Sequence, residues 1–157
     1  MIAPITLISP DAREVMLGVK PRCTTAVSVS SLEEMREHVE GMAPQGPASL
    51  DLLGHSARGT HLLCIGKTTV DMFDPKVAKF FQALAADGVL AARQIVSLRL
   101  LGCETATQPA GKRTIQRLAR MLGVKVYGSV KPLGKSHYDE RGFVPVFHHL
   151  LVEASQL

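Results

Sequence analysis

Short apolar runs bounded by glycine, proline or serine recur along the chain and alternate with segments of helical periodicity. Short runs rich in Leu, Val, Ile and Thr are typical of buried strands, and the residues between them favour turns. The strongest run, at residues 96–101, is followed directly by a glycine. The pattern predicts strands at residues 5–8, 24–29, 49–53, 96–101 and 124–127.

Helical segments follow several of these runs, and their ends carry residues that favour helix capping. Ser30 or Ser31 is expected to cap a helix with acidic residues in its first turn. Asp74, followed by proline, is expected to begin a second helix, because a capping residue before a first-turn proline favours helix initiation. A third helix is expected to begin near Gly111 and to end at Gly123.

The remaining segments predict a hairpin and a less regular C-terminal part. Gly66-Lys67 separates two short apolar runs, which favours a β-hairpin. Residues 128–142 are polar and contain proline and glycine, so we expect a long loop there. Residues 143–151 are apolar again and predict a final strand or helix.

The alternation of strands and helices predicts an α/β fold with a mostly parallel sheet and helices on both faces. The length of 157 residues fits one domain, and the sequence shows no internal repeat or linker. We therefore expect residues 1–157 to form a single domain.

Two of the predicted strands end in a residue with useful chemistry, His55 after Gly54 and Cys103 after Gly102. If these strands are parallel neighbours, the imidazole and the thiol emerge at the same edge of the sheet, where ligands gather in open α/β folds. An imidazole can help a thiol to ionise and can give a proton to a leaving group. The sequence thus predicts a Cys–His pair, and a buried cysteine beside an ordinary polar histidine is the alternative.

Charge and cysteine content narrow the classes of function. A net charge of +4 is only mildly basic, and no nucleic-acid-binding signature accompanies it, so no nucleic-acid partner is expected. The three cysteines show no CxxC spacing, which argues against a disulfide framework and a metal site and favours a reducing compartment such as the cytoplasm. No secretory signal or long apolar run is apparent, so no membrane association is expected. We expect no cofactor.

The residues around His55 and Cys103 resemble those of the caspase-like cysteine peptidases, which include caspases, gingipains, clostripain and the self-processing domains of bacterial toxins. The run Leu53-Gly54-His55-Ser56, with a glycine and a hairpin after it, resembles their histidine segment, and residues 98–103 resemble their cysteine strand. The spacing of the two residues is close to the separation of about 50 known for caspases. The resemblance covers residues 49–142 and implies a caspase-like three-layer sandwich.

The resemblance implies a cysteine endopeptidase that acts on a protein or peptide substrate. Cys103 would attack the scissile carbonyl, His55 would act as general acid and base, and the backbone N–H groups of Ser56 and Cys103 would hold the oxyanion. The loop that lines the substrate pocket in this family points to Ser129 and Lys131 as substrate-binding residues. The family's glycine after the histidine is Ser56 here, so its side chain is expected to crowd the site or change the turn.

Two other interpretations remain. Gly54-His55-Ser56 resembles the nucleophile elbow of α/β-hydrolases, but Arg58 stands where the elbow needs a small residue, and a hairpin is expected where a helix should follow. A catalytically inactive caspase-like interaction module would share the same fold. The sequence leaves open whether the domain works with a partner protein or as a homo-oligomer.

Overall fold

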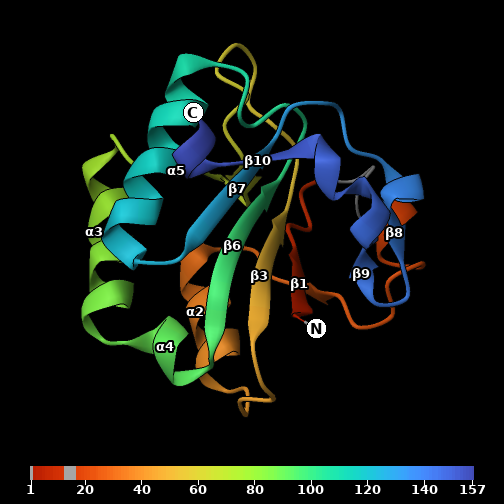
Figure 1. Ribbon diagram of the computed structural model, residues 1–157, viewed down its shortest axis with the longest axis horizontal. Coiled ribbons are helices and arrows are strands. Elements are labelled where there is room, and N and C mark those ends of the chain that lie inside the picture. The colour runs from red at the N-terminus through yellow and green to blue at the C-terminus, as the bar shows by residue number, and fades with distance from the viewer. Residues whose placement is uncertain (1, 13–16) are drawn as a thin grey trace.

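A six-stranded sheet forms the centre of the molecule in a computed structural model that describes residues 2–12 and 17–157 (Figure 1). Its strands are β1 (Ala3–Ile8), β2 (Val27–Ser28), β3 (Ala48–Leu53), β6 (Ile95–Leu101), β7 (Lys125–Ser129) and β10 (Leu151–Glu153). Their order is β10-β7-β6-β3-β1-β2. All neighbouring strands are parallel except β10, which runs antiparallel to β7. The predicted α/β fold with a mostly parallel sheet is confirmed.

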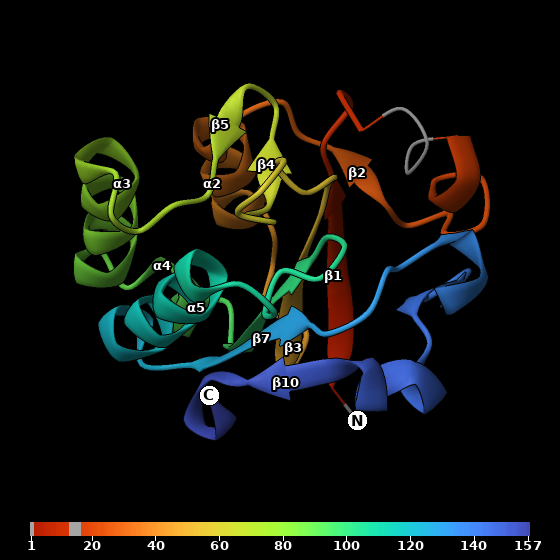
Figure 2. The ribbon, with the colours of Figure 1, turned by 90° about the horizontal axis from the view of Figure 1, so that it is seen from above.

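The two faces of the sheet are covered differently (Figure 2). One face is covered by the longer helices, which are α2 (Leu32–Glu40), α3 (Pro75–Ala86) and α5 (Pro109–Leu122), together with the short helix α4 (Val89–Ala92). The other is covered by shorter elements, which are a helical turn at residues 17–19, the 3-10 helices at Lys135–His137 and Pro145–Leu150, and the hairpin of β8 (Tyr138–Asp139) and β9 (Gly142–Phe143). The sheet and the two layers that cover its faces form a three-layer arrangement. The second outer layer consists mostly of short 3-10 helices and a hairpin.

Alternation along β3 explains how one sheet serves both layers. Leu50 and Leu52 belong to the core on the side of the longer helices, whereas Leu53 belongs to the second core on the opposite side. Successive side chains of a strand point to opposite faces, and both faces of β3 are covered, so every residue of this strand is buried.

Three helix ends carry the kinds of capping residue that the sequence predicted. The Ser31 hydroxyl accepts a hydrogen bond from the Glu34 N–H at 3.0 Å, so Ser31 and not Ser30 caps α2. Asp74 caps α3, and Gly123 ends α5 in the left-handed conformation, with φ of 67°. The short hairpin around Gly66 is also confirmed, as β4 (Cys64–Ile65) and β5 (Thr68–Thr69). Helix α4 was not predicted from the sequence, because it is too short to show a helical period.

Three other expectations are corrected by the structure. The strand predicted at residues 24–29 is reduced to β2, because Ala26 turns back to donate to the Cys23 carbonyl at 3.2 Å. The region 128–142 is not loop throughout, since it completes β7 and includes β8 and the start of β9, whose rings Tyr138 and Phe143 meet edge to face. The final apolar segment contains both a 3-10 helix and a strand, β10. No helix among the described residues is long and apolar enough to cross a membrane.

Candidate active site

The two strands that precede His55 and Cys103 are parallel neighbours, which is the condition on which the predicted Cys–His pair depends. In the pairing of β3 with β6, Leu53 lies opposite Leu101. His55 and Cys103 each follow two residues later, at the carboxyl ends of strands that lie about 4.8 Å apart in a regular sheet. The sheet therefore delivers both residues to the same edge.

A buried ion pair joins these two strands. Asp51 and Arg99 lie opposite each other in the ladder. The Arg99 guanidinium donates two hydrogen bonds to the Asp51 carboxylate, at 2.7 and 2.6 Å, and the aspartate side chain is fully buried. Burial of Arg99 disfavours its charge, but the hydrogen bond and attraction to Asp51 outweigh this and raise the pKa of the guanidinium. Each partner stands four positions before a candidate catalytic residue, so the pair joins β3 and β6 in the register that places His55 and Cys103 level with each other.

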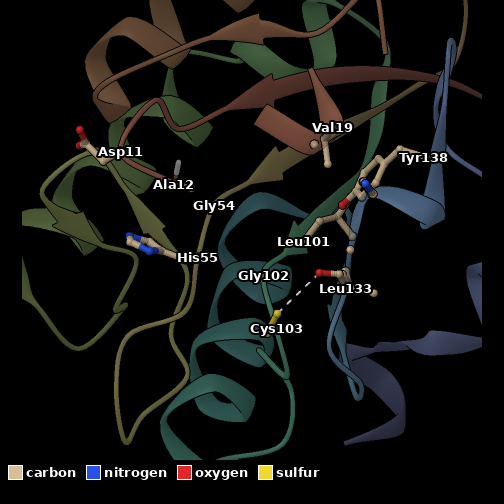
Figure 3. A pocket seen from close by; sticks show the side chains of 13 residues that line it. Asp11, Ala12, Val19, Gly54, His55, Leu101, Gly102, Cys103, Leu133 and Tyr138 are labelled. Carbon is tan, nitrogen blue, oxygen red and sulfur yellow. Dashed lines mark hydrogen bonds between the residues drawn. The ribbon is translucent and has the colours of Figure 1, made fainter. Parts of the chain in front are cut away.

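A pocket of about 540 Å³ opens at this edge, and both His55 and Cys103 line it (Figure 3). Val19, Leu101 and Tyr138 line its apolar interior and are almost completely buried. Burial, followed by the nearby Asp51 charge, raises the pKa of the Tyr138 phenol far above its ordinary range. The phenol therefore stays protonated at neutral pH. The remaining lining residues are Asp11, Ala12, Gly18, Gly54, Gly102, Leu133, Gly134 and Lys135.

The Cys103 thiol is half-buried at the end of β6. Its sulfur lies 3.7 Å from the carbonyl oxygen of Leu133 and donates toward it. The next residue, Glu104, has a φ of 57°, in the left-handed region that non-glycine residues seldom adopt. Cys103 thus stands on a sharp turn that separates its side chain from the strand.

Hydrogen bonds of two buried hydroxyl groups, those of Thr105 and Ser129, stabilise this turn. The Thr105 hydroxyl donates to the Leu100 carbonyl at 2.9 Å and accepts from the Ser129 N–H at 2.9 Å. The Ser129 hydroxyl donates to the Gly102 carbonyl and accepts from the Thr105 N–H at 3.2 Å. These bonds tie the end of β6 to the end of β7 and compensate the cost of the unusual backbone at Glu104.

The predicted substrate-binding residues do not line the pocket. Ser129 is fully buried and is occupied in the hydrogen bonds behind Cys103, so its role is structural. Lys131 is exposed and contributes its backbone carbonyl, which accepts from the Glu104 N–H at 3.4 Å. The same loop does reach the pocket, but through Leu133, Gly134 and Lys135.

The His55 side chain is exposed and is not in contact with the thiol. In Figure 3 the imidazole is turned away from Cys103, toward the side of the pocket where Asp11 lies. Within the described part of the chain, no hydrogen bond joins the imidazole to the sulfur. Rotation about the first side-chain torsion of an exposed residue is fast, so the imidazole can sample other orientations in the pocket.

Ser56 connects the two strand ends. Its hydroxyl donates to the Cys103 carbonyl at 2.6 Å, which turns the side chain away from the pocket interior. The N–H of Ala57 and the carbonyl of His55 bond to the hairpin strand at 2.8 and 2.9 Å, and Ser56 lies between these bonds. Its own N–H therefore points away from the hairpin, as in any non-hydrogen-bonded pair. Among the described residues, neither this N–H nor that of Cys103 has a hydrogen-bond partner.

The nucleophile-elbow interpretation is wrong. That arrangement requires a helix directly after the serine, whereas Ser56 forms an isolated bridge with Leu63 and the chain continues into β4 and β5. The Ser56 hydroxyl is also committed to the Cys103 carbonyl.

Several pocket residues could not have been found from the sequence. Asp11, Val19 and Tyr138 come from distant segments, and no local motif marks them.

In the parts of the chain that are described, no group of three or more potential metal ligands occurs.

Gly54 leads into the site, and replacing it with alanine is expected to destabilise the protein by about 1–3 kcal/mol. A Cβ atom there would lie 2.1 Å from the backbone carbonyl oxygen of Cys64, so the hairpin would have to move. Gly134→Ala is the matched control, because Gly134 also lines the pocket but a Cβ there would meet nothing within 4 Å. Urea unfolding of the two variants measures the difference, and equal midpoints would contradict the expected clash.

A known family model matches the part of the chain that contains this site. The model of a family described as a domain of unknown function, DUF4347, matches residues 10–141. No curated protein matches the chain. The matched range includes His55, Cys103 and all the other residues that line the pocket, from Asp11 to Tyr138. Since the match covers most of the sequence, the chain belongs to the DUF4347 family.

Proposed function

We propose that this domain is a cysteine endopeptidase of the caspase-like type, with Cys103 as nucleophile and His55 as general acid and base. One observation carries the proposal. The parallel pairing of β3 with β6 brings a thiol and an imidazole at these strand ends to one pocket, with Cys103 raised on a strained turn. The resemblance of the flanking sequences to caspase-like peptidases supports the same chemistry.

In the proposed reaction, the Cys103 thiolate attacks the carbonyl carbon of the scissile peptide bond. The unpaired backbone N–H groups of Ser56 and Cys103 stabilise the oxyanion that forms. His55 rotates toward the substrate and gives a proton to the leaving amine, which departs and leaves a thioester on Cys103. Water, deprotonated by His55, then attacks the thioester, which releases the carboxylic acid product and restores the Cys103 thiolate beside a protonated His55.

The second candidate is a catalytically inactive caspase-like interaction module. It is favoured by the orientation of His55, which is turned away from Cys103 in this structure. Both functions would use the pocket to bind a polypeptide, and they differ in whether the thiol is activated. We also propose that the domain works in the cytoplasm, since Cys23, Cys64 and Cys103 are all free thiols and a reducing compartment keeps them so.

Alkylation by iodoacetamide separates the two candidates, because only a thiolate reacts rapidly. We expect Cys103 to be labelled faster than Cys64, and we expect His55→Ala to remove that difference. Cys64 is the matched control, since it is also half-buried and free. The rates are measured by peptide mass spectrometry over a range of pH. Labelling of Cys103 no faster than Cys64 would favour the inactive module.

A further inference from the structure

A second cavity, of about 650 Å³, lies on the sheet face that carries the shorter elements. Its floor comes from the amino-terminal halves of β1, β3 and β6 and from β7, so it lies toward the opposite end of the strands from the Cys103 pocket. We call it the polar groove. Its lining residues are Ile2, Pro4, Ser49, Val96, Ser97, Arg99, Lys125, Tyr127, Asp139, Arg141, Phe143, Pro145 and His148.

Two polar side chains on the floor have unused hydrogen-bonding capacity. Ser97 is only 7% exposed, and its hydroxyl has no hydrogen-bond partner among the described residues. Arg99 uses Nε and one terminal nitrogen on Asp51, which leaves the donors of its other terminal nitrogen without a partner in the described structure. A hydroxyl and a guanidinium edge that both border the same cavity can each donate a hydrogen bond to an acceptor group of a ligand.

The walls of the polar groove are aromatic. The Phe143 ring lies 5.3 Å from the Arg99 guanidinium carbon. Tyr127 and His148 meet edge to face, with ring centroids 5.0 Å apart. Burial and the nearby Arg99 lower the pKa of His148, so its ring is neutral at neutral pH. Flat apolar groups pack well against such walls.

The charges around the polar groove favour an anion. Asp51 already balances Arg99, so attraction depends on the rim, where Lys125 and Arg141 face a single carboxylate, Asp139. Lys125 is 70% exposed and only loosely paired with Glu153, at 4.0 Å. The lining of the groove therefore carries two exposed cations and one carboxylate, and a ligand carboxylate would compete with Glu153 for Lys125.

We propose that the polar groove binds a small organic anion with a flat apolar body, such as an aryl carboxylate. The carboxylate accepts from Ser97 and Arg99 and is attracted by Lys125 and Arg141, and the ring packs between Tyr127 and Phe143. The volume lies within the range of about 300–1,000 Å³ that is common for small-molecule sites. This site is independent of the proposed peptidase chemistry.

Titration with benzoate, followed by backbone amide NMR shifts, tests the proposal. Benzamide is the matched probe, since it has the same ring without the charge. We expect benzoate to shift amides of β6, β7 and β9 saturably and to bind at least about fivefold more tightly than benzamide. We expect the Lys125→Gln/Arg141→Gln variant to lose at least about threefold in benzoate affinity.

Lys112→Gln/Arg120→Gln is the control variant, because it removes the same charge from the exposed side of α5, away from the polar groove. It is expected to bind benzoate unchanged. Ser97→Ala keeps the fold and is expected to weaken benzoate binding several-fold through loss of one hydrogen bond. Equal affinities for benzoate and benzamide, or shifts confined to residues outside the groove, would overturn the proposal.

Discussion

Replacement of Cys103 by alanine is expected to reduce the rate of peptide hydrolysis by about 10³-fold or more. Under the proposed mechanism the sulfur forms the bond to the substrate, no second thiol lines the described part of the pocket, and the Ser56 hydroxyl is bonded to the Cys103 carbonyl. His55→Ala is expected to reduce the rate by about 10²–10⁴-fold, the range typical of a general acid–base residue. Mass spectrometry of a proteome-derived peptide mixture measures the cleavage, because such a mixture offers many candidate sequences at once.

Cys64→Ala provides the control for this experiment. Cys64 is half-buried like Cys103, but it lies in the hairpin, with its sulfur directed to the Leu62 carbonyl at 3.8 Å. We expect this variant to keep full activity and stability close to that of the unmodified protein. Cleavage that persists in Cys103→Ala would exclude the thiol as nucleophile, and cleavage absent from every form would support the interaction module.

Replacement of Asp51 by alanine is expected to destabilise the fold by about 3–5 kcal/mol, because it leaves a buried guanidinium without its partner. The Arg99 side chain is 12% exposed, so water replaces little of the lost interaction. The double replacement Asp51→Leu/Arg99→Leu is expected to recover much of the loss, since no uncompensated charge remains. Unfolding in urea, followed by circular dichroism, measures all three proteins.

Arg36 supplies the comparison with an exposed ion pair. It bonds to Glu40 at 2.8 Å and to Asp87 at 2.7 Å, with short distances like those of the Arg99 pair, but these partners are largely solvent-accessible. Arg36→Ala is expected to change the unfolding midpoint far less than Asp51→Ala. Similar losses in the two variants would contradict the expected high cost of leaving the buried Arg99 guanidinium without its partner.

Some of the structural features on which these predictions depend could be recognised in the sequence, and others could not. The strands that lead to His55 and Cys103 are apolar along their length and end at glycine, so their location and direction could be predicted. The cap at Asp74 could also be predicted, and the cap of α2 could be narrowed to Ser30 or Ser31, because capping depends on a side chain and a backbone group a few residues away.

Other parts of the site depend on contacts that no local pattern encodes. Ser129 was expected to bind substrate, yet its hydroxyl is buried against Gly102, which follows a different strand. Asp51 and Arg99 are two charged residues within apolar strands, and only the register of β3 and β6 places them opposite each other. Tyr138 enters the pocket only because β8 and β9 fold back over the sheet.

The sequence alone determined the α/β class, the positions of the main strands and the placement of a histidine and a cysteine at two strand ends. Local periodicity suffices for these features, because it reports which side chains must be buried and where the chain must turn. Only the tertiary structure decided that β3 and β6 are neighbours, which residues line the pocket, and how His55 is oriented. Those features arise from packing between segments that are far apart in the chain. The energies of such contacts depend on both segments, so they cannot be deduced from the sequence of one segment alone.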